Sequence, residues 1–289
     1  MHPLIPYFER PSIAIPIPGP WGDAIHIHGF GILVAVGVWL GSRMTMNKCS
    51  RDGLDPETIN RFLTWIIVGI LVGGHLGHAL FYDLDYYLKH PLEIFYVFSG
   101  LSSFGGFIAC TIAAVVFFHT ERKSFWTYGD TLAYGFTLGW FFGRMGCFVA
   151  HDHIGLETQF WLGVQGVCPG HEGNSAYACH DVGLYEGLYS GLFMLPLFAW
   201  LDRKPRFPGF FVGLWCLLYG PVRFVLDAMR HPLTDTRYFT LTPAQYGAIL
   251  LSLVGAAILW TRKDMLPIRT MIGKASDEAP PEAPTQTPA

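Results

Sequence analysis

Two arginines and two carboxylic acids stand inside segments of the chain that are otherwise strongly apolar. They are Arg144, Glu186, Arg223 and Asp227. Ionisable side chains at membrane depth are costly, and a functional role is the default hypothesis for them. A guanidinium group is always charged and matches phosphate oxygens with paired hydrogen bonds. The two arginines therefore predict a site for a phosphate-bearing lipid head group.

The same residues also permit a purely structural interpretation. Arg223 and Asp227 are four positions apart, so on a helix they could neutralise each other. Glu186 or Asp152 could then serve Arg144. With both pairs formed, the charges would hold helices together without binding any ligand.

The composition is that of an integral membrane protein. Of the 289 residues, 51% are hydrophobic and 16% aromatic, and only 14% are charged, against roughly 25% in soluble domains. Mean hydropathy is +0.34. The net charge of −3 excludes a strongly basic nucleic-acid-binding protein. We expect no nucleic-acid partner and an all-α, polytopic membrane fold.

Seven segments are long and apolar enough to cross a bilayer. The third is interrupted near 99–106 by a run of Ser and Gly residues, which predicts a re-entrant element followed by a helix. The predicted spans are 29–48, 62–82, 92–119, 129–150, 182–201, 209–228 and 243–261.

The Lys and Arg residues of the connections set the predicted orientation, because they are enriched on the cytoplasmic side. One set of alternate connections carries four of them and the other carries thirteen. The N-terminus is therefore expected outside and the C-terminus in the cytoplasm. The predicted parts are an outer arm (1–28), helices one to four (29–150), an outer head segment (151–181), helices five to seven (182–262) and a disordered cytoplasmic tail (263–289).

The head segment contains Cys168 and Cys179, which face the oxidising side in this orientation. A disulfide is allowed there, and two free thiols are the alternative. The intramembrane polar residues are all predicted to lie towards this outer side, and no polar ladder reaches the cytoplasm. That pattern favours a lipid head-group site over a conduction path.

Residues 143–155, GRMGCFVAHDHIG, resemble the signature G-R-x-G-N-F-x-N-x-E-x-x-G of the prolipoprotein diacylglyceryl transferases. The leading Gly-Arg pair, Gly146, Phe148 and Gly155 are kept. Cys147 and Ala150 replace the two asparagines, and Asp152 replaces the glutamate. Further similar segments follow in the family's order, covering about 20–265 in all: 73–82, 105–106, 184–186 and 219–230.

The resemblance implies an enzyme of the bacterial inner membrane, monomeric and without cofactor or metal. Its members transfer the diacylglyceryl group of phosphatidylglycerol to the lipobox cysteine of a prolipoprotein signal peptide, releasing glycerol phosphate. Carried over to this chain, the resemblance places Arg144 and Arg223 on the lipid phosphate and Glu186 among the catalytic residues. The supporting residues would be His28, Asp152, Tyr219, Asp227 and Arg230.

The chain departs from the family pattern at its histidines. Phe104 stands where the family has a histidine, and His75 and His78 replace an arginine and a tyrosine. We therefore expect His78, His75 or His151 to accept the thiol proton. Two alternatives remain. In one, a cluster of His28, His75, His78, His151, Asp152 and His153 binds zinc or iron and supports an altered lipid transferase or hydrolase. In the other, the protein binds lipid or lipoprotein without catalysis.

Overall fold

The structure is a computed structural model that describes residues 3–16, 24–96, 100, 102–231, 237–268 and 270. The chain divides into two compact units, Met1–Gly41 with Ala133–Ala289, and Ser42–Leu132. The predicted tail beyond residue 270 and part of the predicted arm, 17–23, lie outside the described residues.

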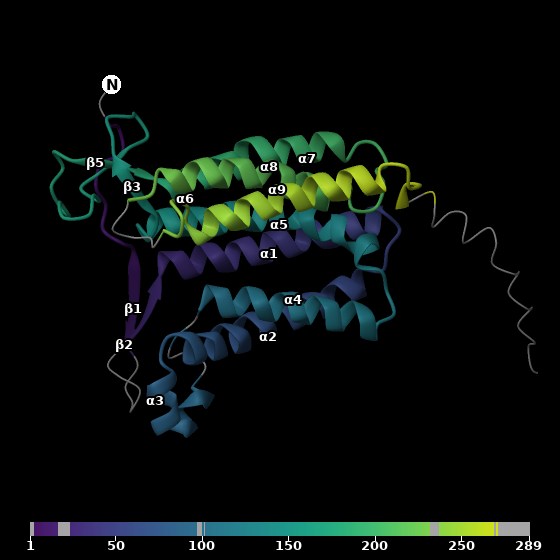
Figure 1. The fold of residues 1–289 in the computed structure, drawn as a ribbon, viewed down its shortest axis with the longest axis horizontal. Helices are drawn as coiled ribbons and strands as arrows, with labels where there is room; N and C mark the ends of the chain where they lie inside the picture. Colours follow the sequence, from purple (N-terminus) through teal and green to yellow (C-terminus); the bar gives the residue numbers. More distant parts are fainter. Residues whose placement is uncertain are drawn as a thin grey trace, which may run out of the picture. The chain divides into compact units, whose positions relative to one another are not determined.

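The protein is mostly helical (Figure 1), and its long apolar helices make it a polytopic membrane protein. Within the described residues, five helices are long and apolar enough to cross a membrane. They are α1 (Gly29–Arg51), α2 (Pro56–Phe81), the continuous helix of α6 (Val182–Leu188), η2 (Tyr189–Met194) and α7 (Leu195–Leu201), α8 (Phe210–Ala228) and α9 (Pro243–Arg262). The other helices are α3 (Leu84–Lys89), η1 (Pro91–Phe95), the short apolar α4 (Ser103–Thr120) and the 25-residue α5 (Phe125–Val149).

The third predicted span differs from the helix that forms. Residues 91–95 make only a 3₁₀ turn, and α4 begins at Ser103. The Ser102 hydroxyl accepts a hydrogen bond from the Gly105 amide at 3.3 Å and so caps α4. Gly105 therefore lies in the first turn of a helix and not in a break. Residues 99 and 101 of the predicted re-entrant element lie outside the described part.

In the unit Ser42–Leu132, α2 and α4 pack through glycines. A Cβ on Gly77 would lie 2.5 Å from the Gly105 Cα, so only hydrogen at both positions allows this approach. Towards the other end of the pair, Phe62 contacts Phe117 and Phe118. Beyond them Arg61 and Glu121 form an ion pair at 2.8 Å.

In the larger unit, small residues again let helices approach closely. A Cβ on Gly41 of α1 would lie 2.9 Å from the carbonyl oxygen of Gly135 in α5. Helices α8 and α9 lie side by side (Figure 1), and a Cβ on Gly255 would lie 2.7 Å from the Gly213 carbonyl. This close packing fixes α5 and α8, the helices that carry the arginines.

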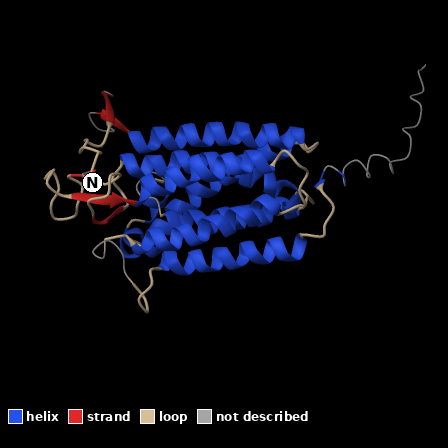
Figure 2. Ribbon diagram, turned by 90° about the horizontal axis from the view of Figure 1, so that it is seen from above, coloured by secondary structure: helices blue, strands red, loops and turns tan. Residues whose placement is uncertain are grey.

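The strands of this unit gather at one end of its helices (Figure 2). One sheet pairs β1 (Ser12–Pro16) with β2 (Ala24–His28), antiparallel. The head segment forms a second sheet in the order β3-β5-β4, from Ile154–Glu157, Ala178–Asp181 and Val164–Gln165.

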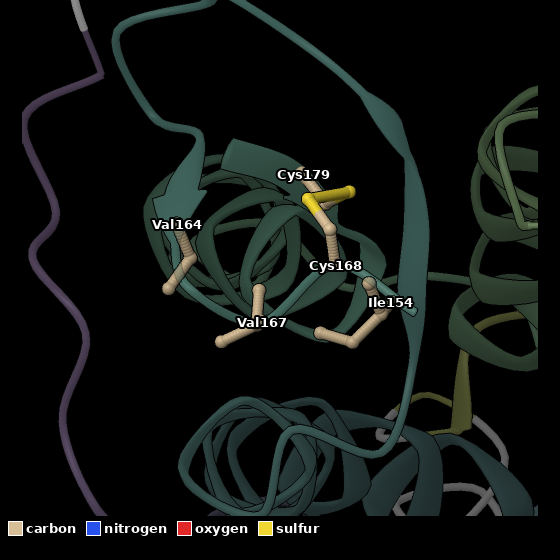
Figure 3. Packing of buried hydrophobic residues seen from close by; sticks show 5 residues of the cluster. All are labelled: Ile154, Val164, Val167, Cys168 and Cys179. Atoms are coloured by element: carbon tan, nitrogen blue, oxygen red, sulfur yellow. A yellow bond between two sulfur atoms is a disulfide. The ribbon is translucent and has the colours of Figure 1, made fainter. Parts of the chain in front are cut away.

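A disulfide joins Cys168 and Cys179, whose Cα atoms are 5.4 Å apart, so the disulfide alternative is the one that forms. The bridge lies in a small core with Ile154, Val164 and Val167 (Figure 3). The head is thus a compact covalently closed element between α5 and α6.

Removal of this bridge should destabilise the head. Closing a loop of this size contributes about 3 kcal/mol by restricting the unfolded chain. We expect the double variant Cys168→Ala/Cys179→Ala to melt at a lower temperature in detergent. Reductant should lower the melting temperature of the wild type and leave the double variant unchanged. Cys110→Ala, which removes a free thiol, is the control, and a wild type insensitive to reductant would contradict the prediction.

Candidate functional site

The predicted lipid-phosphate residues converge within the larger unit, where α5, α6 and α8 approach one another. Arg144 lies in the last two turns of α5, and Glu186 lies in the second turn of α6. Tyr219 and Arg223 lie one turn apart on α8. Helical spacing thus directs both α8 side chains towards the same carboxylate.

Glu186 is the centre of this arrangement. Its side chain is fully buried. The Arg144 Nε lies 2.7 Å from Oε2, and the Tyr219 hydroxyl donates to the same oxygen. Arg223 donates to Oε1 from its Nη1. One buried carboxylate therefore holds two guanidinium groups from different helices.

Asp227 is a second buried carboxylate, one turn further along α8. Its Oδ1 lies 3.0 Å from Arg223 Nη2 and 3.9 Å from Arg230 Nη1. Its Oδ2 accepts a hydrogen bond from the Thr242 hydroxyl. Thr242 also caps α9 in a capping box with Gln245, so the start of α9 is tied to the charge network.

Aromatic rings line one side of Arg144. Its guanidinium lies 4.5 Å from the Trp140 ring centre. Tyr219 packs against Trp140 edge to face at 5.5 Å and stacks on Trp215 at 4.7 Å. These rings keep water from the ion pairs and hold the Tyr219 hydroxyl in place, which strengthens the electrostatic interactions.

The network joins three guanidinium groups to two buried carboxylates. Arg144, Arg223 and Arg230 face Glu186 and Asp227, and Arg230 also interacts electrostatically with Asp152. The Arg223–Asp227 pair of the structural interpretation does form, but Arg223 also shares Glu186 with Arg144. The arrangement can therefore bind an anion and stabilise negative charge that develops on it.

The predicted histidines have separate surroundings. His151, next to the end of α5, has its Nε2 2.9 Å from the Phe8 carbonyl oxygen and packs on the Phe8 ring. His28, at the end of β2, lines a cavity of about 420 Å³ together with Arg10 and Asp152. His153 Nδ1 lies 3.3 Å from Asp152 Oδ2, and this contact lowers the pKa of the Asp152 carboxyl.

His75 and His78 belong to the unit Ser42–Leu132. His75 is fully buried, and its Nδ1 lies 3.2 Å from the Gly100 carbonyl oxygen. His78 pairs with Asp83, Nε2 to Oδ2, at 3.0 Å and stacks on Tyr82. Both residues therefore have local partners in their own unit.

Several residues of the site were not predicted from the sequence. Trp140, Thr242 and Gln245 belong to the network described above. The Thr-Pro-x-Gln pattern at 242–245 is a helix-start signal that could have pointed to two of them. Asp181 caps α6 with its Oδ1 2.9 Å from the Leu184 amide, and burial raises its pKa to about 7.

The similarity to known proteins extends over nearly all the residues of this site. A family model described as prolipoprotein diacylglyceryl transferase matches residues 20–261. The chain belongs to this family. The expectation of a transferase of this kind is confirmed.

Named relatives are similar over almost their full length. A phosphatidylglycerol–prolipoprotein diacylglyceryl transferase of Chromohalobacter salexigens is 31% identical over 90% of this chain and 96% of its own. Proteins of the same name from Pseudomonas syringae and Idiomarina loihiensis are 31% and 27% identical, over 89% and 90% of this chain and 95% and 97% of their own.

The signature segment 143–155 of this transferase runs from α5 into the head. Its last residue, Gly155, lies where β3 meets the chain after α8, and the Leu156 amide donates to the Met229 carbonyl at 2.8 Å. A Cβ on Gly155 would lie 2.6 Å from that carbonyl oxygen. The glycine thus permits the backbone approach that holds Arg230 beside Asp227.

Gly155→Ala should therefore push β3 away from residues 229–231. We expect a loss of about 1–3 kcal/mol in stability, as for other overpacked sites, with a fall in transferase activity. Gly143→Ala is the matched control within the same signature, because a Cβ there meets nothing within 4 Å. Thermal unfolding of both variants in detergent tests this, and equal midpoints would contradict it.

Proposed function

We propose that this transferase moves the diacylglyceryl group of phosphatidylglycerol onto the thiol of a lipobox cysteine in a prolipoprotein signal peptide. Glycerol phosphate is the leaving product. The single observation that carries the proposal is that two arginines from different helices, Arg144 and Arg223, share one buried carboxylate, Glu186. A phosphate monoester leaving group gains negative charge as its C–O bond breaks, and buried guanidinium groups stabilise that charge.

Within the proposal, Arg144 and Arg223 bind the lipid phosphate and Glu186 orients both of them. Asp227 and Arg230 support Arg223 from the next turn of α8. Tyr219 donates to Glu186 and lies 3.4 Å from Arg144 Nη2, so it fixes the carboxylate and the arginine together. Asp152 and His28 border the cavity beside the end of α5.

The general base is proposed from the chain's departure from the family pattern at Phe104, with His78, His75 and His151 as the candidates. His151 already uses Nε2 on the Phe8 carbonyl. His78 has a carboxylate partner, Asp83, which would orient its ring. His75 is held by Gly100 and fully buried.

We further propose seven membrane crossings, with the N-terminus and the head outside a bacterial inner membrane and the C-terminus in the cytoplasm, as a monomer. The asymmetry of Lys and Arg supports this orientation. Cysteine-labelling of single-cysteine variants in the head and in the 203–206 connection tests it. Labelling of the head by a membrane-impermeant reagent added to spheroplasts is the expected result.

The test of the function is complementation. The chain is expressed in bacteria whose own diacylglyceryl transferase can be shut off, and lipoprotein modification is followed. We expect rescue, and purified protein should form the thioether from phosphatidylglycerol and a lipobox peptide. Normal insertion without either activity would overturn the proposal. It would favour an altered lipid reaction or a binding protein instead.

A further inference from the structure

The C-terminal end of α5 brings three different metal-binding side chains together. The helix closes with two backbone hydrogen bonds, from the Asp152 amide to the Cys147 carbonyl at 3.2 Å and from the His151 amide to the Phe148 carbonyl at 3.1 Å. His151, the residue before Asp152, has a backbone φ of 50°. This is the Schellman closure of a helix, and it folds Asp152 and His153 back over Cys147.

The left-handed position in this turn is occupied by histidine where glycine is the usual residue. A non-glycine residue there is strained by about 1–2 kcal/mol. The His151 side chain holds it in place through the Phe8 carbonyl and the ring contacts to Phe8 and Tyr7. The turn that brings the three side chains together is therefore held in place by contacts with the N-terminal segment.

The donor atoms are close enough to share one ion. A sulfur of Cys147, a carboxylate oxygen of Asp152 and a ring nitrogen of His153 all lie within 4.8 Å of one another. In a tetrahedral zinc site, with bonds of about 2.0–2.3 Å, the donors are about 3.3–3.8 Å apart. Side-chain movements of about 1–1.5 Å bring the donors from that separation to those of a zinc site.

The three side chains have few competing partners. His153 Nδ1 is buried and has no hydrogen-bond partner within the described residues, although it lies 3.3 Å from Asp152 Oδ2. Cys147 is a free thiol whose contact here is with Arg144 Nη1 at 3.9 Å. Cys147 stands at a position where the family signature has asparagine, so a sulfur ligand at this position would distinguish this chain from that signature.

We propose that Cys147, Asp152 and His153 bind a zinc ion. Thiolate, imidazole and carboxylate are the ligand types of zinc sites. Three protein ligands leave the fourth position open, as in catalytic zinc sites. Asp152 is mostly exposed and also lines the 420 Å³ cavity with Arg10 and His28, so the open position can be reached from that cavity.

The open position suits a thiol, and this step rests on the function proposed above. The acceptor cysteine binds through sulfur, and its proton passes to the general base as the zinc–sulfur bond forms, because a zinc-bound thiol is deprotonated. The sulfur then forms a C–S bond to the glyceryl carbon while the C–O bond to phosphate breaks. The bonding electrons leave with glycerol phosphate, beside Arg144, and the zinc ion is unchanged.

The first experiment measures metal without reference to activity. The full chain is purified in detergent without a metal-binding tag, and zinc is quantified by mass spectrometry. We expect one zinc per chain. Cys147→Ala and His153→Ala should weaken zinc binding by more than about 100-fold, since changes outside the ligand shell already cost about 10–100-fold. His171→Ala and Cys216→Ala, a histidine and a free thiol elsewhere in the same unit, are the matched controls.

The second experiment uses the unaltered protein, so that misfolding of a variant cannot decide the outcome. Zinc is removed by a chelator and replaced by cobalt. A sulfur-to-cobalt charge-transfer band is expected. The visible spectrum of the cobalt-loaded protein should change when a lipobox peptide is added, but not when the same peptide carries serine in place of cysteine.

The outcomes separate the two proposals. If neither stoichiometric zinc nor the cobalt band is found, the metal site is overturned. If protein from which zinc has been removed still transfers the diacylglyceryl group at the full rate, the catalytic role of zinc is overturned while the proposed function stands. A cobalt band that does not change on addition of the cysteine-containing peptide overturns only the binding of the thiol to the metal. A bound metal and a spectral response without any transfer from phosphatidylglycerol would support the site and overturn the proposed function.

Discussion

Arg144→Ala is expected to abolish diacylglyceryl transfer while leaving the protein folded. The guanidinium contacts Glu186, Tyr219 and Trp140, and in the proposed mechanism it also binds the lipid phosphate. Loss of one charge-stabilising donor typically costs about 10²–10³ in rate. The fold should survive, because Glu186 keeps its bonds to Arg223 and Tyr219 and is not left unpaired.

Arg144→Lys should also be poorly active, because a lysine ammonium is a point charge and cannot span two phosphate oxygens in a plane. Initial rates of thioether formation and detergent melting temperatures are measured together for both variants. Arg61→Ala is the control, since it removes an arginine from a half-exposed ion pair with Glu121, which is worth at most about 1 kcal/mol. Full activity of either Arg144 variant would mean that the phosphate binds elsewhere.

The helices were largely predictable because their apolar segments are long and their ends carry strong signals. The span 182–201 was predicted with the bounds of the helix that forms, and 243–261 ends one residue before α9 does. Helix α2 begins six residues before the predicted 62–82 span, at Pro56, because Asp55 caps it by accepting from the Glu57 amide. Hydropathy alone does not detect such polar first turns, but the Asp-Pro-Glu pattern does.

The charge network was predictable in its members but not in its connections. Depth and residue type pointed to Arg144, Glu186 and Arg223, yet the sequence left open whether Glu186 or Asp152 pairs with Arg144. In the structure Glu186 forms ion pairs with both arginines, and Asp152 pairs with His153. This depends on which faces of α5, α6 and α8 meet, and spacing along one chain does not determine that.

The histidine cluster could not be predicted from the spacing of its members along the sequence. His151 and His153 are two residues apart, but the turn at His151 sends one ring to Phe8 and the other to Asp152. The sequence pattern His-x-His does not reveal a left-handed residue at its first position. The association of Cys147 with Asp152 and His153 likewise follows from that turn and was not predicted.

Glu186→Gln should produce the largest loss of stability among single substitutions at the site. Glutamine has the same shape but no charge, so Arg144 and Arg223 would lose the carboxylate that they share. Breaking a buried ion pair by neutralising one partner costs about 3–5 kcal/mol. We expect a markedly lower melting temperature in neutral detergent and a large loss of transfer activity.

The same variant should respond more strongly to anionic lipid than the wild type does. With the carboxylate gone, the phosphate of phosphatidylglycerol becomes the available counter-charge, and a ligand that binds only the folded state raises its stability. The melting temperature of Glu186→Gln should therefore rise further with phosphatidylglycerol than that of the wild type, and phosphatidylcholine should have a smaller effect. Ser190→Ala is the control, because its buried hydroxyl lies one turn along the same helix and donates to the Glu186 carbonyl, not to the Glu186 side chain.

A double-mutant cycle separates charge balance from packing. Removing Arg144 in the Glu186→Gln background takes away one uncompensated charge, so Arg144→Ala should be less damaging to stability there than in the wild type. The expected coupling is about 0.5–3 kcal/mol, the range for residues in contact. Additive effects, together with equal responses of wild type and variant to phosphatidylglycerol, would show that Glu186 does not balance the arginines. The phosphate-binding role of the network would then have to be abandoned.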